Sequence, residues 1–387
     1  MKGRVSMKRI LKGCLAVVLA VLICCSFTVS YGAISAEEIS APSAVLIEAE
    51  TGKVLFEKES NQVRACASIT KVMTMILVME AIDAGKLKME DMITSSAHAA
   101  SMGGSDIWLE EGEVMSVYDL IKATMVASAN DAAVALAEEV EGSEDAFVAK
   151  MNEKAKKLGM KNTTFKNCNG LDEEGHLTSA YDVALMSQEL IKHEEIFEFT
   201  SIWLDYLRDG KTQIVNTNKL LKSYKGITGL KTGTTSQAGS CISATAKRDG
   251  LTLIAVVLGG ATGKERFADA TKLLDYGFAN YCVYTPAFDE EIPELTVING
   301  MQPNLKAQAN LSGSFVIEKG KSKDITYKLN INEEVTAPIN KGDKVGTLTF
   351  YIGKEKLREY PIVANHLVEE MNFGLVFKLL FKCFVQV

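Results

Sequence analysis

Residues 64–74 read Arg-Ala-Cys-Ala-Ser-Ile-Thr-Lys-Val-Met-Thr and lead directly into an apolar stretch that continues to Ala84. The spacing of the apolar residues predicts a helix that ends near Gly85 and has Ser68 at its N-cap or in its first turn. In such a helix Ser68 and Lys71 share one face, one turn apart. A desolvated lysine can take the proton of a serine hydroxyl, and the positive end of the helix dipole favours an oxyanion. The stretch therefore predicts an activated serine nucleophile.

The Ser-x-x-Lys spacing alone is a weak signal, because most chains of this length contain it by chance as a capping serine and a solvated lysine. Two further motifs follow in order along this chain. Ser128-Ala129-Asn130 reads as S-x-N, and Lys231-Thr232-Gly233 reads as K-T-G. The trio S-x-x-K, S-x-N and K-T-G is typical of serine acyl-transferases that recognise penicillin. The three motifs together therefore predict one site.

Composition excludes some classes of function. The chain has 387 residues, 47% of them hydrophobic, which is enough for a large core and predicts two domains. The formal net charge of −7 gives no indication of nucleic-acid binding. The four histidines are scattered without the spacing of metal ligands, so we expect neither a metal site nor a cofactor.

The N-terminus has the pattern of a targeting segment. Basic residues precede an apolar run from Cys14 to Val29, and small residues follow it at Ser30, Gly32, Ala33 and Ser35. This order is typical of a cleaved secretory signal, so residues 1–35 are predicted to be a signal peptide. The alternative is an uncleaved anchor, because the apolar run is only slightly short of a membrane span. Both interpretations predict an exported protein at the outer face of the bacterial cytoplasmic membrane or in the cell wall.

The order of the predicted elements indicates an α+β fold. Residues 42–58 alternate around Glu50-Thr51-Gly52 and predict a β-hairpin, while 240–247 and 251–258 predict two later strands. Helical patterns occupy residues 117–126, 131–140, 146–158, 180–193 and 265–281. A hairpin at the start, helices in the middle and strands late predict one sheet assembled from both ends of the chain, with helices packed on it.

The character of the sequence changes after about residue 285. Short alternating runs separated by turns that contain Lys and Gly predict a small all-β domain over residues 285–365. The last residues, 373–387, are nearly all apolar, with Lys378 and Lys382 on one helical face. This stretch is short for a membrane span, so 366–387 are predicted to be an amphipathic helix that anchors the chain at the membrane surface. The alternative is a core helix of the β domain.

The motif segments resemble the D-alanyl-D-alanine carboxypeptidases, which are low-molecular-mass penicillin-binding proteins that trim peptidoglycan stem peptides. The resemblance rests on residues 67–74, 128–133 and 229–235, and extends through 216–221 to the export signal, the β-rich domain and the C-terminal anchor. It implies a β-lactamase/transpeptidase-like domain over residues 36–284, with an antiparallel sheet flanked by helices. It also implies a serine peptidase that releases the terminal D-alanine of stem pentapeptides through an acyl-enzyme and is inhibited by β-lactam antibiotics.

The resemblance implies a catalytic role for three side chains, Ser68, Lys71 and Ser128, and places Lys231 among the residues that bind the substrate. Ser68 attacks the carbonyl between the two terminal D-alanines, and Lys71 is its base. Ser128 passes the proton to the departing amine, close to the positive charge of Lys231.

The resemblance also implies a set of binding residues. Asn130 holds the substrate amide, and the backbone N–H groups of the nucleophile and of Thr234 form the oxyanion hole. Within the K-T-G segment, which ends at Gly233, Thr232 donates a hydroxyl to the substrate carboxylate, and Thr234, directly after it, donates another. Arg266 matches the arginine that recognises this carboxylate in relatives, and the alternative for it is a surface salt bridge.

Two positions depart from the family's pattern. Relatives usually have proline where Cys66 stands, so the start of the catalytic helix is expected to be less rigid. Relatives often have histidine where this chain has Asn169 before Gly170-Leu171. If that histidine supports deacylation, turnover of the acyl-enzyme is slower here.

Three other functions share these motifs. A class A β-lactamase needs a glutamate in E-x-x-L-N, and the nearest match, at Glu174, lacks the final Asn. Penicillin is therefore predicted to stay attached to Ser68 for many minutes. A non-catalytic penicillin-binding wall sensor is disfavoured because every motif side chain is intact. A transpeptidase would differ only in that an amine, rather than water, resolves the acyl-enzyme.

Overall fold

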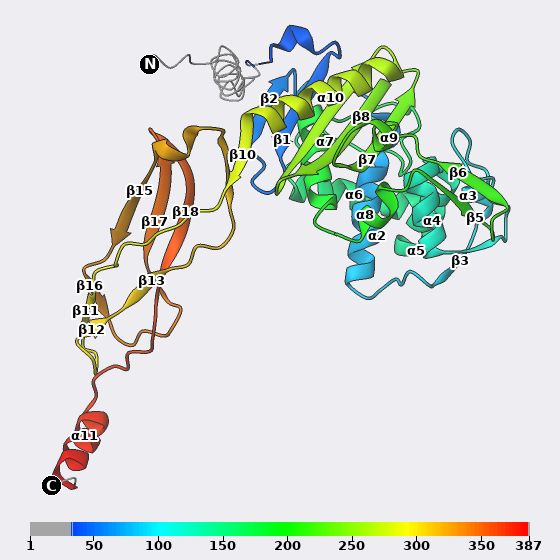
Figure 1. Ribbon diagram of the computed structural model, residues 1–387. Coiled ribbons are helices and arrows are strands. Elements are labelled where there is room, and N and C mark those ends of the chain that lie inside the picture. Colours follow the sequence, from blue (N-terminus) through cyan, green and yellow to red (C-terminus); the bar gives the residue numbers. More distant parts are fainter. Residues whose placement is uncertain (1–31, 33, 386–387) are drawn as a thin grey trace, which may run out of the picture. The chain divides into compact units, whose positions relative to one another are not determined.

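The computed structural model describes residues 32 and 34–385 (Figure 1). The signal peptide predicted for residues 1–35 therefore lies almost wholly outside the described residues. Within the described residues, no helix combines the length and apolar character that crossing a membrane requires.

Five antiparallel strands form the central sheet, in the order β2-β1-β9-β8-β7 (Figure 1). Their bounds are β1 (Ser43–Glu48), β2 (Val54–Lys58), β7 (Ile227–Thr235), β8 (Gly239–Arg248) and β9 (Leu251–Gly260). The first strand pairs with β9, so that Ser43 lies opposite Leu258. All six residues of β1 are buried, as expected for a central strand covered on both faces. The prediction of one sheet built from both ends of the chain, and of an α+β fold, is confirmed.

Side chains of successive strand residues point to opposite faces of the sheet. Both faces of this sheet carry buried apolar side chains, and helices cover both faces. Val45 and Ile47 of β1 belong to the large core that contains the buried residues of α2 and α7. Leu46, between them, lies against Gly277 of α10 on the other face. The helices of this domain are α2 (Lys71–Asp83), α3 (Ala97–Ala100), α4 (Val117–Lys122), α5 (Asn130–Glu141), α6 (Glu144–Lys157), α7 (Ala180–Leu190), α8 (Ile196–Thr200), α9 (Leu220–Ser223) and α10 (Gly263–Asn280).

The predicted helices are present, with two local differences that matter for the site. The catalytic segment first forms a 3-10 turn, Ala67–Thr70, and the α-helix proper begins only at Lys71. The helix predicted over 117–126 is α-helical to Lys122 and then continues as a π-helical segment, Ala123–Ala127. One irregular segment contains a motif serine and the other directly precedes one. The backbone of both segments differs from that of a regular α-helix.

Two short hairpins flank the helical region and were not predicted. Strand β3 (Met92–Thr94) pairs with β4 (Val114–Ser116), and β5 (Leu204–Leu207) pairs with β6 (Thr212–Val215). Each strand has only three or four residues, which is too short for alternation to stand out in the sequence.

The C-terminal region is β-rich around its own hydrophobic cluster, as predicted. Its strands are β10 (Tyr281–Tyr284), β11 (Leu295–Ile298), β12 (Asn304–Leu305), β13 (Ala307–Ala309), β14 (Phe315–Glu318), β15 (Ile325–Ile331), β16 (Glu334–Thr336), β17 (Lys344–Ile352) and β18 (Glu355–Ala364). Strand β18 is not evident from the sequence, because it begins with charged residues and contains Pro361, which argues against a strand. The last helix is α11 (Phe373–Val385), so the predicted C-terminal helix is present and begins at Phe373.

Candidate active site

The fold brings the three motifs together around two buried lysines. The Nζ atom of Lys71 lies 3.1 Å from the Oγ of Ser68 and donates to the Oδ1 of Asn130 at 2.5 Å. The Nζ of Lys231 donates to the Oγ of Ser128 at 2.8 Å. The residues predicted from S-x-x-K, S-x-N and K-T-G are thus linked in two hydrogen-bonded groups that share one buried region.

The turn before Ser68 is held by close backbone approaches. Ala67 has a φ of 51°, which is uncommon for a residue with a Cβ, and its carbonyl accepts a hydrogen bond from the Oγ1 of Thr70 at 2.9 Å. A Cβ on Gly170 would lie 2.1 Å from the oxygen of Ala67. A Cβ on Gly233 would lie 2.9 Å from the nitrogen of Ser68. Glycine is therefore required at both positions for the loop and the K-T-G strand to approach the nucleophile.

Ser128 lies at the corner between the π-helical segment and α5. Its φ of 65° is in the left-handed region, and the next residues leave this strained corner to start a new helix. Asn130 begins α5, with its backbone N–H donating to the carbonyl of Ser105 and its side-chain Nδ2 donating to the carbonyl of Gly103, both at 2.7 Å. Asn130 is therefore held by the backbone of residues 103–105.

Burial controls the charge of both lysines. Lys71 is fully buried, and desolvation lowers its pKa to about 7. Desolvation also lowers the pKa of Lys231, with further lowering from the positive charges of Lys71 and Arg266. A lysine that titrates near neutral pH is present in its neutral form often enough to accept a proton. Lys71 has that property together with a position next to the serine hydroxyl.

The K-T-G strand β7 forms one edge of the sheet and carries the other predicted binding residues. The Oγ1 of Thr232 donates to the Oγ1 of Thr217 at 2.7 Å. Arg266 reaches the same strand from α10, where its Nη1 donates to the carbonyl of Gly233 at 2.9 Å and to the Oγ1 of Thr234 at 2.8 Å. Its Nε is buried without a hydrogen-bond partner among the described residues. The guanidinium is thus tied to the K-T-G strand itself, and it retains an unused donor.

Sequence reasoning missed several contacts because a backbone atom or a distant loop supplies them. The Nζ of Lys71 also donates to the backbone carbonyl of Asn169 at 2.7 Å. The Oδ1 of Asp172 accepts from the Oγ1 of Thr235 at 2.6 Å, which ties the same loop to the end of β7. The side chain of Glu174 is exposed on this loop. The Asn-Gly-Leu-Asp sequence indicates an irregular segment, but residue identity does not show which backbone carbonyl will contact a side chain.

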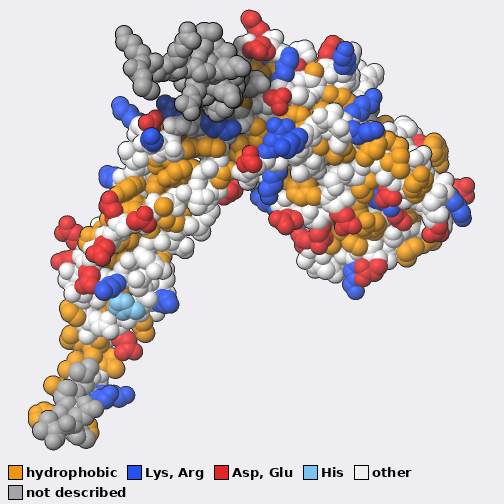
Figure 2. Space-filling view, in the orientation of Figure 1, with side chains coloured by type: hydrophobic (Ala, Val, Ile, Leu, Met, Phe, Trp, Pro, Cys, Tyr) orange, Lys and Arg blue, Asp and Glu red, His pale blue; other side chains and the backbone are white. Residues whose placement is uncertain are grey.

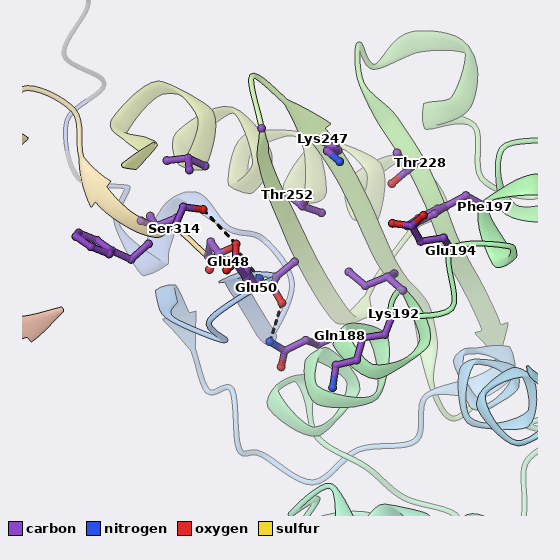
Figure 3. Close-up of a pocket in the computed structure, with 16 residues that line it drawn as sticks. Glu48, Glu50, Gln188, Lys192, Glu194, Phe197, Thr228, Lys247, Thr252 and Ser314 are labelled. Carbon is purple, nitrogen blue, oxygen red and sulfur yellow. Dashed lines mark hydrogen bonds between the residues drawn. The ribbon is translucent and has the colours of Figure 1, made fainter. Parts of the chain in front are cut away.

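A separate surface pocket is lined by side chains of both charges (Figure 3), among them Glu48, Glu50, Lys192, Glu194 and Lys247. The carboxylate of Glu48 already accepts hydrogen bonds from the backbone N–H groups of Glu50 and Thr51. All the motif residues, which belong to the described part of the chain, are outside its lining. This pocket is therefore distinct from the candidate active site.

Comparisons with known families agree with this geometry. Residues 31–262 match the family model described as D-alanyl-D-alanine carboxypeptidase. Residues 287–370 match the model described as penicillin-binding protein 5, C-terminal domain. Together the two matches span both domains.

Individual relatives are similar over most of their length. D-alanyl-D-alanine carboxypeptidase DacF of Bacillus subtilis is 47% identical over 339 residues, which cover 86% of this chain and 87% of the relative. Penicillin-binding protein 5 from Haemophilus influenzae superposes with a TM-score of 0.78 at 31% identity, covering 87% of this chain and all (100%) of that chain. Penicillin-binding protein D2 from Listeria monocytogenes, in its ampicillin-bound form, has a TM-score of 0.57 at 36% identity and covers 62% of this chain and 98% of that chain.

Proposed function

The chain belongs to the D-alanyl-D-alanine carboxypeptidase family, and we propose that Ser68 is its nucleophile and Lys71 its general base. It is a serine-type D-alanyl-D-alanine carboxypeptidase of peptidoglycan metabolism, as the family resemblance implied. The observation that supports these two roles is the 3.1 Å distance from a fully buried Lys71 Nζ to the Ser68 Oγ. The neutral amine takes the hydroxyl proton while Oγ bonds to the carbonyl carbon of the penultimate D-alanine.

Collapse of the tetrahedral intermediate breaks the peptide C–N bond and needs a proton on the leaving nitrogen. The Oγ of Ser128 is placed to deliver it, since the Nζ of Lys231 donates to this oxygen at 2.8 Å and stabilises negative charge on it. Free D-alanine leaves, and water then attacks the ester to restore Ser68. The backbone N–H groups of Ser68 and Thr234 stabilise the oxyanion in both halves of the reaction.

Strand β7 offers the substrate a docking edge. Because it is an edge strand, its outer backbone groups can pair with an extended peptide as a further strand would. Thr232, Thr234 and Arg266 then surround the terminal carboxylate, and the guanidinium of Arg266, whose Nη1 donates to the Oγ1 of Thr234, supplies a positive charge there. Asn130 holds the substrate amide on the opposite side of the nucleophile.

The decisive experiment measures free D-alanine released from a pentapeptide that ends in D-Ala-D-Ala. The wild-type chain is expected to release D-alanine, and Ser68→Ala is expected to release none while keeping its fold. Release by both proteins would contradict the role of Ser68. Release by neither, with penicillin still forming an adduct on the wild type, would indicate a transpeptidase or a sensor.

β-Lactams are proposed to acylate the same serine. Solved structures of Penicillin-Binding Protein D2 from Listeria monocytogenes are in ampicillin- and cefotaxime-bound forms. Because Glu174 is exposed and the loop contributes Asn169 where relatives often have histidine, we expect the penicilloyl ester on Ser68 to persist for many minutes. Intact-protein mass spectrometry measures its lifetime, and an adduct that disappears within seconds would indicate a β-lactamase.

Helix α11 is proposed to hold the protein at the outer face of the cytoplasmic membrane. Its exposed apolar side chains recur at helical spacing and form one stripe, made of Phe373, Phe377, Leu380, Phe381 and Phe384. In the full chain, Phe377→Asp with Phe381→Asp is expected to abolish flotation with anionic phospholipid vesicles. Met92→Asp, at an exposed apolar position outside α11, serves as the control. Unchanged flotation of the α11 variant would contradict the anchor.

A further inference from the structure

Trp108 has a conformation that the fold alone does not require. Its side chain is 76% exposed and its φ is 55°, a left-handed value that is rare for a bulky residue. The neighbours on both sides, Ile107 and Leu109, are buried. The loop therefore turns one large apolar side chain outward between two that face the core.

Two charged residues hold this conformation through the backbone. Asp131, buried at the start of α5, accepts hydrogen bonds from the N–H groups of Ile107 and Leu109, both at 3.0 Å. Arg208 donates to the carbonyl of Ile107 at 2.9 Å and to the carbonyl of Trp108 at 3.3 Å. A strained residue persists only where its surroundings over-determine it, and such residues cluster at ligand sites. The bonds fix the indole in an exposed position.

The loop that carries Trp108 also forms part of the active site. The carbonyls of Gly103 and Ser105 accept hydrogen bonds from Asn130, and Asn130 in turn contacts Lys71. Trp108 lies only three residues after Ser105, so it is within roughly 11 Å of that contact even if the chain is extended. The segment that carries Trp108 therefore borders the active site, and a long substrate bound there can reach Trp108.

An exposed apolar face continues the surface beyond the loop. In the β5–β6 hairpin Leu204 lies opposite Val215 and Tyr206 lies opposite Gln213, and all four side chains point outward because they alternate with the inward Leu207 and Ile214. Arg208, at the hairpin turn, makes the contacts to the Trp108 loop described above. Hydrophobic side chains gather on the lobe that carries β5 and β6 (Figure 2). Exposed apolar surface of this kind, next to a catalytic site, is typical of a binding region.

We propose that Trp108 and the outward face of the β5–β6 hairpin bind the amino sugar to which the stem peptide is attached. The inference rests on the proposed function and names a further part of the same substrate. The pyranose ring presents rows of C–H groups, and its N-acetyl group presents a methyl, both of which pack on the negative face of an aromatic ring. The outward side chains of the patch carry no charge, which suits a neutral sugar.

The length of the substrate fits this position. Four residues separate the scissile bond of a stem pentapeptide from the sugar, and an extended chain of that length spans about 13–14 Å. Trp108 lies within roughly 11 Å of the Asn130 contact, so a peptide extended from Ser68 is long enough to bring its sugar to the Trp108 loop. The sugar then contributes to binding without contacting the reacting atoms.

The test compares two substrates with the same peptide: the free pentapeptide and the pentapeptide attached to a disaccharide of N-acetylated amino sugars. We expect Trp108→Ala to lower kcat/KM for the glycosylated substrate roughly 3- to 10-fold and to leave the free pentapeptide unchanged. Trp108→Phe, which keeps an aromatic face, should retain most of the activity, whereas Trp108→Leu should behave like the alanine variant. Tyr327→Ala, at an exposed aromatic position in the β-rich domain, is the matched control.

Other outcomes overturn the proposal. An equal loss on both substrates would show that Trp108 contacts the peptide, and no loss on either would show that the patch has another occupant, such as a protein or a lipid surface. Binding affinity can also be measured without turnover, in proteins that carry Ser68→Ala. The Ser68→Ala variant should bind the glycosylated pentapeptide 3- to 10-fold more tightly than the double variant Ser68→Ala with Trp108→Ala. Equal affinities would overturn the sugar contact. By contrast, failure of the wild type to release D-alanine from either substrate contradicts the proposed function.

Discussion

The Nε2 of His176 lies 2.8 Å from the Oγ1 of Thr70, and that hydroxyl donates to the carbonyl of Ala67, directly before the nucleophile. The other ring nitrogen, Nδ1, accepts a hydrogen bond from the backbone N–H of Lys166. Nδ1 is therefore unprotonated, Nε2 carries the proton, and the ring is neutral. Burial lowers the pKa of His176 to about 4, which agrees with a neutral ring at physiological pH. This chain of hydrogen bonds connects the loop that carries His176 to the turn before Ser68 and stabilises that turn.

Stability should therefore depend on pH through His176. The folded state keeps the ring neutral, whereas the unfolded state binds a proton below pH 6.5, so the free energy of unfolding falls as pH drops from 6.5 to about 4. The total loss from this residue is roughly 3 kcal/mol. Urea unfolding at several pH values should show a shallower decrease for His176→Gln than for wild type. Identical slopes for His176→Gln and wild type would refute the prediction.

Acylation should follow the ionisation of Lys71. Because only the neutral amine accepts a proton and burial lowers the pKa of Lys71 to about 7, the rate constant for acylation by penicillin should rise from pH 5 to 7 and level off above. Stopped-flow measurements with a fluorescent penicillin provide this profile. Lys71→Arg, which stays protonated, should lose roughly 10²- to 10⁴-fold. A wild-type rate that is flat between pH 5 and 9 would rule out Lys71 as the base.

Alanine at Gly170 should disrupt the nucleophile far more than alanine at a comparable glycine. Both Gly170 and Gly159 have positive φ values, 90° and 76°, but a Cβ at Gly159 meets nothing within 4 Å whereas one at Gly170 would collide with the carbonyl of Ala67. Gly159→Ala should cost about 1 kcal/mol of stability from its backbone alone.

Gly170→Ala should cost at least about 2 kcal/mol more than this and should also slow acylation, because the turn before Ser68 has to move. Thermal unfolding and the acylation rate of the two variants provide the comparison. Equal stability and equal acylation rates would mean that the loop relaxes without disturbing the catalytic turn.

Arg266 should give selectivity for a free terminal carboxylate. Wild type is expected to cleave a peptide ending in D-Ala-D-Ala with a higher kcat/KM than the same peptide with a terminal amide. Arg266→Gln should lose roughly 10- to 100-fold on the acid and little on the amide, because a charge-assisted hydrogen bond is removed. Arg248→Gln, an arginine of β8 that stacks on Tyr224, is the control. A variant that loses both substrates equally would assign Arg266 to folding.

The sequence identified the candidate catalytic side chains but not the backbone contacts that hold them. Ser68, Lys71, Ser128 and Lys231 were predicted because side-chain chemistry requires particular residue types at particular spacings. The carbonyl of Asn169, which contacts Lys71, was not predicted, because any residue supplies the same backbone atom.

Tertiary context explains the remaining differences. His176 was seen only as one of several scattered histidines, since its contact with Thr70 spans 106 residues of sequence. The left-handed conformation of Ser128 depends on a π-helical segment that the apolar pattern of an ordinary helix does not distinguish. Long periodic elements such as α5 and α10 were predicted to within a few residues.

The pairing of β1 with β9 determines when the central sheet can be completed during folding. The chain is synthesised from its N-terminus, so β1 can pair only with β2 until β9 has been made. The pairing of β1 with β9, which includes Leu258, therefore forms late. The K-T-G strand joins the same sheet through β8, so the sheet that carries Lys231 is complete only after this late, long-range pairing. A nascent or truncated chain consequently carries Ser68 and Lys71 without the completed sheet that supplies Lys231 to the site. Covalent labelling by penicillin therefore reports that folding of the peptidase domain has reached its end.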